Sequence, residues 1–216
     1  MLVGDDILSS LVGRACEPFV GAFPCEPEGV IMIMLEMSAR HVHVSKEDLE
    51  TLFGKGYELK KKKDLSQPGQ FACEEKVEVI GERGSAMLSI LGPERKETQV
   101  EISLTDGRSL GLKAPVRESG DLHDAGPVTL KGPAGEVKKE HAVICAKRHI
   151  HMTEADAKTH NVTNGEIVKV EVNSPERKLI FDDVVIRVSN SYALAMHIDT
   201  DEANACVGAT EAKIVS

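Results

Sequence analysis

The sequence predicts a mainly β protein with two similar halves and a short amphipathic helix ahead of them. Three observations lead to this fold class. Short runs of alternating apolar and polar residues recur along the chain, turn signals such as Pro68-Gly69 separate them, and one motif occurs twice. Many short strands with regular turns are typical of a barrel or a sandwich.

The first expected element is a helix over residues 5–16. Its apolar residues recur at helical spacing and form one stripe, made of Ile7, Leu8, Leu11, Val12 and Ala15. Residues 17–29 are rich in Pro and Gly and are predicted to be a linker. The stripe must be buried, either on the chain's own domain or on another protein.

From residue 30 onward we expect mostly strands. The apolar run at 30–35 predicts a buried strand, and period-two alternation predicts others at 77–79, 99–104, 168–172 and 184–188. Helices are expected only at about 46–53, 153–160 and 200–206. We divide the chain into an N-terminal segment (1–30), a first half (31–140) and a second half (141–216).

Composition narrows the classes of function. The net charge of −9 argues against nucleic-acid binding, although basic clusters such as the lysine run at 60–63 leave an anionic small substrate open. No apolar run approaches the ~18 residues that span a membrane. The five cysteines are scattered, which indicates free thiols in a reducing cytoplasm. A nucleophilic Cys145, close to a histidine pair, is an alternative.

The repeated motif is the main organising feature of the sequence. Residues 40–48 read Arg-His-Val-His-Val-Ser-Lys-Glu-Asp, and residues 148–156 read Arg-His-Ile-His-Met-Thr-Glu-Ala-Asp. Each copy predicts a strand with two histidines, followed by Ser45 or Thr153 as the N-cap of a helix. A duplicated strand-turn-helix unit predicts two halves related by approximate two-fold symmetry.

The two His-x-His pairs, His41/His43 and His149/His151, have the spacing of metal ligands. Residues i and i+2 of a strand point to the same face, so two imidazoles can converge on one ion at ~2.0–2.1 Å. Buried structural histidines are the alternative, but they give no reason for a second copy. The sequence therefore predicts two divalent metal ions, with zinc preferred.

Three further residues stay open on spacing alone. His197, at the end of a strand-like run, is either a ligand or an ordinary partly buried histidine. Glu101 is more typical of a solvated strand carboxylate than of a ligand. Arg95 follows a turn, where an arginine suits bidentate phosphate binding, but a surface arginine is the simpler interpretation.

Several motifs closely resemble those of the PduL-type phosphotransacylases, the phosphate propanoyltransferases. The resemblance runs in order from about residue 34 to 206 and rests on residues 38–45, 65–71, 91–93, 96–101, 115–121, 148–152 and 196–204. Ala195 departs from it, since an acid often stands before the Met-His pair. The resemblance is specific because it includes both His-x-His motifs.

The resemblance implies an acyltransferase with two similar β-barrel domains, short capping helices and two zinc ions. Such an enzyme reversibly exchanges phosphate and coenzyme A on a short acyl group such as propionyl. By position, the ligands of one zinc become His41, His43 and Glu101, and those of the other become His149, His151 and His197. Arg95 becomes the phosphate contact, and the positions where coenzyme A would lie are Ser38, Lys63, Leu91 and Asn204.

The same resemblance gives the N-terminal segment a role. Many enzymes that the chain resembles work inside bacterial microcompartments, and residues 5–29 look like their encapsulation peptide. We therefore expect shell or lumen proteins as partners, a cytoplasmic place inside such a compartment, and leave homo-oligomers open. A dizinc acyl-CoA hydrolase and a non-catalytic interaction protein with structural zinc are the alternatives. Structural zinc sites have four protein ligands, whereas three are expected here for each ion.

Overall fold

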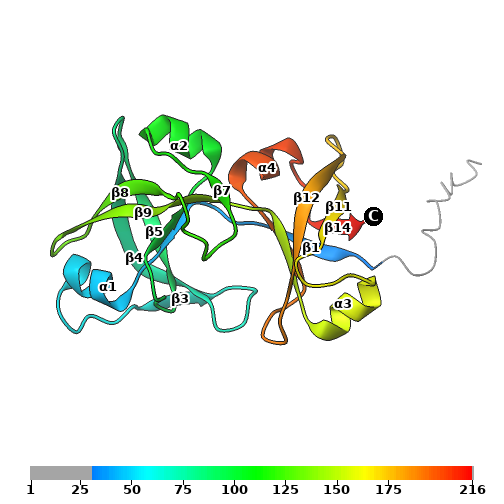
Figure 1. Cartoon of the computed structure of the whole chain (residues 1–216), viewed down its shortest axis with the longest axis horizontal. Coiled ribbons are helices and arrows are strands. Elements are labelled where there is room, and N and C mark those ends of the chain that lie inside the picture. Colours follow the sequence, from blue (N-terminus) through cyan, green and yellow to red (C-terminus); the bar gives the residue numbers. More distant parts are fainter. Residues whose placement is uncertain (1–30, 216) are drawn as a thin grey trace, which may run out of the picture. The chain divides into compact units, whose positions relative to one another are not determined.

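The computed structural model describes residues 31–215, whose strands form two closed barrels of six strands each (Figure 1). The predicted mainly β fold with two barrels and few short helices is thereby confirmed. The helix expected over 5–16 and the linker expected over 17–29 lie outside the described residues. None of the helices between residues 31 and 215 is long and apolar enough to cross a membrane.

The first barrel closes in the order β4 (Phe71–Ile80), β5 (Ser85–Gly92), β2 (His41–His43), β6 (Gln99–Glu101), β9 (Glu136–Ala146) and β8 (Gly126–Lys131), which pairs back with β4. Two strands extend it, β3 (Lys61–Asp64) beside β4 and β7 (Val116–Arg117) beside β9. Its helices are α1 (Lys46–Phe53) and α2 (Leu104–Leu110). The interior is aliphatic, with Val42, Ile90 and Val100 fully buried.

The second barrel closes in the order β1 (Ile33–Met37), β13 (Ala195–Ile198), β10 (His149–Met152), β12 (Leu179–Val188), β11 (Ile167–Val172) and β14 (Glu211–Ile214). Its helices are α3 (Glu154–His160) and α4 (Thr200–Ala205). Its core is also mostly aliphatic and includes the fully buried Ile150 and Met196. The aliphatic composition of both barrel interiors thus agrees with the low aromatic content of the sequence, which is 3%.

Strand β1 belongs to the second barrel although it precedes the first barrel in the sequence. It pairs in parallel with β13 and antiparallel with β14. Without it, these two strands would expose open edges, which proteins avoid. The chain leaves the first barrel only after β9, whereas the division expected at residues 140 and 141 falls inside that strand.

The strand-turn-helix repeat predicted from the sequence is present in both barrels. β2 leads into α1 through the N-cap Ser45, and β10 leads into α3 through the N-cap Thr153. Each cap side chain accepts a hydrogen bond from a backbone N–H three residues on. The copies differ in their aspartate. Asp156 completes a capping box, while Asp48 instead pairs with Lys139 Nζ at 2.7 Å.

A second repeat, which the sequence analysis missed, joins β6 to α2 and β13 to α4. The strand predicted at 99–104 ends at Glu101, and the part of this prediction beyond Glu101 is wrong. Ser103 caps α2, so Leu104 begins a helix and is 42% exposed. Asp199 caps α4 in the same way. In both barrels the strand before the cap lies antiparallel to the histidine strand.

Polar contacts join the two barrels around the site. The backbone N–H of Thr105 in α2 donates to the Asp201 carboxylate in α4 at 2.9 Å. The Gln67 side chain of the first barrel donates to the carbonyl of Ala193 in the second at 2.9 Å and accepts from its N–H at 3.2 Å. These contacts set the position of one barrel's histidines relative to the other's.

Candidate active site

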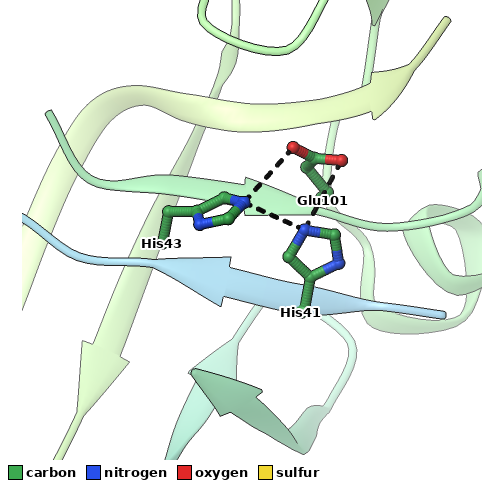
Figure 2. A group of neighbouring side chains, drawn as sticks. All are labelled: His41, His43 and Glu101. Carbon is green, nitrogen blue, oxygen red and sulfur yellow. Dashed lines mark hydrogen bonds and ion pairs between the residues drawn. The ribbon is translucent and has the colours of Figure 1, made fainter. Parts of the chain in front are cut away.

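The first histidine pair meets a carboxylate inside the first barrel (Figure 2). His41 and His43 project from β2, and Glu101 comes from β6, where it is the register partner of His41. The Nε2 atoms of the histidines are 3.2 Å apart, and the Glu101 oxygens lie 3.5 Å from His41 Nε2 and 3.7 Å from His43 Nε2. Two nitrogens bound at ~2.0–2.1 Å to a tetrahedral ion would be about 3.3 Å apart. The spacing therefore fits one shared metal ion.

Backbone carbonyls fix the orientation of both rings. His41 Nδ1 donates to the Ala39 carbonyl at 2.8 Å, and His43 Nδ1 donates to the Leu91 carbonyl at 3.1 Å. A carbonyl can only accept, so each Nδ1 carries a proton, and a neutral ring in this orientation has its free lone pair on Nε2. This contact is the usual support of a metal-bound histidine.

Burial and mutual charge set the protonation of this group. Burial and the neighbouring His41 lower the pKa of His43 to about 3. Burial alone would raise the pKa of Glu101, but the charge and hydrogen bond of His41 hold it well below its usual value. Burial would likewise lower the pKa of His41, and Glu101 reverses this effect and raises it. Glu101 is therefore an ionised carboxylate facing at least one neutral imidazole.

Hydrogen bonds from neighbouring side chains fix the position of the Glu101 carboxylate. Ser119 Oγ donates to Glu101 Oε1 at 2.7 Å, and Gln99 Nε2 donates to the same oxygen at 2.6 Å. Arg95 Nη1 donates to Ser119 Oγ at 3.0 Å. The arginine that the resemblance assigns to phosphate is thus connected through one hydroxyl to the expected metal ligand.

The second histidine group gathers in the second barrel. His149 and His151 lie on β10, and His197 on β13 is the register partner of His149, as Glu101 is of His41. The ring centroid of His149 lies 4.6 Å from that of His151 and 5.3 Å from that of His197. His149 Nδ1 donates to the Lys147 carbonyl at 2.8 Å, the same contact that His41 makes.

All three imidazoles of the second group are held in the neutral form that a metal requires. Burial, with the neighbouring His197, lowers the pKa of His149 to about 4. Burial, with His149 next, lowers the pKa of His151 to about 2. Burial also lowers the pKa of His197. Neutral rings keep the nitrogen lone pairs that a metal ion would bind.

The two groups differ as candidate metal sites, because among the described residues only the first brings three donor atoms close enough together for one ion. In the first, the three donor atoms lie within 4.8 Å of one another. In the second, His151 Nδ1 is buried and has no hydrogen-bond partner within residues 31–215, so a ligand or contact could still satisfy it. The Gln67 side-chain nitrogen lies 3.4 Å from His197 Nε2, so this ring is not yet directed at the other two. The first group is the more complete site.

One cavity of about 890 Å³ contains both groups. Of the other residues assigned by the resemblance, it is lined by Ser38, Lys63, Leu91 and Arg95. Asn204 is exposed on α4 and does not line it. The cavity has more basic than acidic side chains, with Arg40, Lys63, Arg95, Lys147 and Arg187 against Glu36, Glu101 and Asp199. An anionic ligand is therefore favoured locally in a chain whose net charge is −9.

Several lining residues were not found from the sequence. Gln67, Ser119, Arg187 and Tyr192 lie in the cavity, and the Tyr192 ring is 4.2 Å from that of His151. Arg187 carries no motif, but it is the register partner of His151 in a strand pair that pattern reasoning did not assign. Gln67 and Ser119 lie within motifs already recognised, at 65–71 and 115–121, without an assigned role.

Cys145 does not serve as a nucleophile at this site. Its thiol donates to the Asp199 carboxylate at 3.3 Å and does not line the cavity. Burial, and next the hydrogen bond to Asp199, raises the pKa of the Cys145 thiol far above its usual value. A thiol in this state is inert at neutral pH.

Comparisons with known proteins agree on one family. The family model described as phosphate propanoyltransferase matches residues 34–209. A phosphate propanoyltransferase of Clostridioides difficile is 56% identical over 175 residues, which is 81% of this chain and 83% of that protein. Proteins of the same name from Thermotoga maritima and Enterococcus faecalis are each 54% identical, over 176 and 173 residues. The Thermotoga maritima alignment covers 81% of this chain and 84% of that protein, and the Enterococcus faecalis alignment covers 80% of this chain and 82% of that protein.

Proposed function

The chain belongs to the phosphate propanoyltransferase family of acyltransferases, and from this premise we propose that it moves a propanoyl group between coenzyme A and inorganic phosphate. In one direction, propanoyl-CoA and phosphate give propanoyl phosphate and coenzyme A. The observation that supports the proposal is a cavity lined by both histidine pairs and by Arg95, in which His41, His43 and Glu101 lie close enough together to hold a metal ion.

We propose that each group of three residues holds one zinc ion. Imidazole nitrogen and carboxylate oxygen suit zinc, and three protein ligands leave a position open for substrate. The lone pairs of His41 and His43 that face Glu101 support the first site. The neutral histidines around the unpartnered Nδ1 of His151 support the second. Bound zinc would supply Lewis acidity that stabilises negative charge on the reacting oxygen or on the departing sulfur.

Arg95 would hold the phosphate for attack. Its backbone N–H donates to the Val44 carbonyl at 2.9 Å, and its guanidinium donates to Ser119, so the side chain is anchored at both ends. Burial lowers the pKa of Arg95, but an arginine stays charged at neutral pH. An anchored guanidinium presents two parallel donors to two phosphate oxygens. A further oxygen of the same phosphate is then free to point toward the thioester.

The acyl transfer itself needs no covalent enzyme intermediate. A phosphate oxygen forms a bond to the thioester carbonyl carbon, the carbon–sulfur bond breaks, and coenzyme A leaves as the thiolate. Cys145, the side chain considered as a nucleophile, lies outside the cavity lining, and its thiol donates a hydrogen bond to Asp199. Direct attack by phosphate is therefore the simpler course.

Coenzyme A would fill the remainder of the cavity. The cavity volume of about 890 Å³ lies near the upper end of the ~300–1,000 Å³ typical of small-molecule sites. Ser38, Lys63 and Leu91 line it, and Lys63 makes no ion pair within residues 31–215. A free ammonium group suits the phosphates of a nucleotide-containing ligand.

The test is thiol release from acetyl-, propanoyl- and butanoyl-CoA, with and without phosphate, with acyl phosphate trapped as the hydroxamate. We expect release only with phosphate, and one acyl phosphate for each thiol. Release without phosphate would show a hydrolase instead. No release with zinc-loaded, folded protein would leave a non-catalytic interaction protein.

We also propose that residues 1–30 direct the enzyme into a bacterial microcompartment. The apolar stripe expected over 5–16 and the Pro/Gly-rich residues 17–29 support this role. They lie outside the part of the chain that the structure describes. The match to the family model begins at residue 34, which is consistent with a segment separate from the catalytic unit.

A further inference from the structure

Arg187 is a cavity residue without a partner. It lies on β12 as the register partner of His151, lines the cavity and is partly buried. Between residues 31 and 215 its guanidinium makes neither an ion pair nor a side-chain hydrogen bond, whereas the cavity residue Arg40 pairs with Asp106 at 2.7 Å. A partly buried guanidinium loses part of its hydration, and an anion bound beside it would compensate that loss.

The acidic residues of the cavity are engaged elsewhere. Glu101 faces the first histidine pair, and Glu36 accepts from the Ser66 hydroxyl and lies 3.6 Å from His197 Nδ1. Asp199 caps α4 and accepts from the Cys145 thiol. Residues 31–215 therefore offer Arg187 no free carboxylate in the cavity, which leaves its charge available for an anionic ligand.

The two barrels differ at the position of Arg187. In the first barrel His41 pairs with Ser89 of β5, and in the second His149 pairs with Val185 of β12. Two residues further on, these strands carry Leu91 and Arg187 respectively. The first barrel uses the Leu91 carbonyl to hold His43, whereas the second places a cation beside its histidines.

Arg187 is also within electrostatic reach of Arg95. Burial lowers the pKa of Arg95 most, the charge of Glu101 raises it, and the charge of Arg187 lowers it again. The same charge contributes, after burial and the neighbouring histidines, to the low pKa of His149 and His151. The two guanidinium groups thus come from different barrels and face one cavity, with no anion of the described chain paired to either.

We propose that Arg187 binds the phosphate substrate jointly with Arg95, so that each barrel supplies one arginine to the transferred phosphoryl group. This inference rests on the proposed function. A phosphate dianion carries enough charge for two guanidinium groups, which each bind it in a bidentate manner. The diphosphate of coenzyme A has the same chemistry, and the kinetics of the two substrates distinguish them.

The experiment compares Arg187→Gln and Arg187→Lys with the exposed-site control Arg108→Gln, all loaded with zinc. For Arg187→Gln we expect the KM for phosphate to rise roughly 10- to 100-fold, as for a lost charged hydrogen bond. The KM for propanoyl-CoA should change less than about 2-fold, since its contacts are elsewhere. Arg187→Lys should recover part of the loss, and calorimetric titration with phosphate alone should show the same order of affinities.

Each other outcome overturns the inference. An increase confined to the KM for propanoyl-CoA would assign Arg187 to coenzyme A, and unchanged kinetics would remove it from the substrate site. Loss of zinc or of the fold in both variants would show a structural role. If the unmodified enzyme itself shows no phosphate-dependent thiol release, the proposed function fails as well. If the unmodified enzyme shows phosphate-dependent thiol release and both Arg187 variants behave like the Arg108→Gln control, the inference on Arg187 fails while the proposed function stands.

Discussion

Replacing Gln99 by methionine should selectively weaken the first metal site. The Gln99 side chain is 2% exposed and makes three hydrogen bonds. Its amide nitrogen donates to Glu101 at 2.6 Å and to Ser119 at 3.0 Å, and its oxygen accepts from the Gly120 N–H at 2.8 Å. Methionine keeps the length and the packing of the side chain but removes all three contacts.

The size of the effect follows from the contact to Glu101. A hydrogen bond to a charged group contributes about 1.5–3 kcal/mol, which corresponds to roughly 10- to 150-fold in affinity when that group is the ligand. Loss of a hydrogen bond to a metal ligand typically lowers metal affinity by about 10- to 100-fold, which agrees with this range. The unpartnered Gly120 N–H should in addition lower the free energy of unfolding by about 1–3 kcal/mol.

The assay is zinc titration in competition with a chromophoric chelator, with circular dichroism to verify the fold. One of two zinc ions should bind roughly 10- to 100-fold more weakly, while the other keeps its affinity because it is bound by another strand pair. Gln67→Met is the matched control, since Gln67 contacts His197 in the second group and should spare the first ion. A folded Gln99→Met protein that binds both ions as tightly as the unmodified chain would refute the reasoning.

Three further perturbations test other parts of the structure. Arg95→Ala should lower kcat/KM for phosphate by about 2–4 kcal/mol of transition-state binding without loss of zinc, and normal phosphate kinetics would contradict its assignment. Asp48→Ala removes a side chain that is 8% exposed and paired with Lys139 at 2.7 Å, and urea unfolding should show a loss of about 2–3 kcal/mol. This is less than for a fully buried pair because Lys139 reaches water, and a loss below about 1 kcal/mol would show that the pair is unimportant. A chain starting at residue 31 should keep its activity, aggregate less and fail to enter purified microcompartments. Lost activity with fold and zinc intact, or continued entry, would contradict the targeting role.

Local patterns in the sequence were sufficient for the repeated unit of the fold. Two histidines at period two, followed by Ser45 or Thr153 at an N-cap, are governed by contacts within a few residues, and both strand-cap-helix units are present. The second repeat was equally local but divergent. Ser103 and Asp199 cap their helices by the same contact, yet Glu101 and His197 differ in residue type, so the equivalence was hidden.

Features set by long-range pairing could not be predicted in this way. Nothing local in β1 shows that it pairs with strands far along the chain. The position of Arg187 depends on the parallel pairing of β12 with β10. Side chains that meet only through such pairing carry no motif.

We propose that the two groups of three residues each hold one zinc ion in a single cavity, and elemental analysis can count these ions. The measurement is the zinc content of the intact chain, purified with zinc present, next to that of Glu101→Ala and His149→Ala. We expect about two ions per intact chain and about one in each variant, because the two groups lie on separate strand pairs. An intact, folded chain without zinc, or variants that retain both ions, would contradict the account.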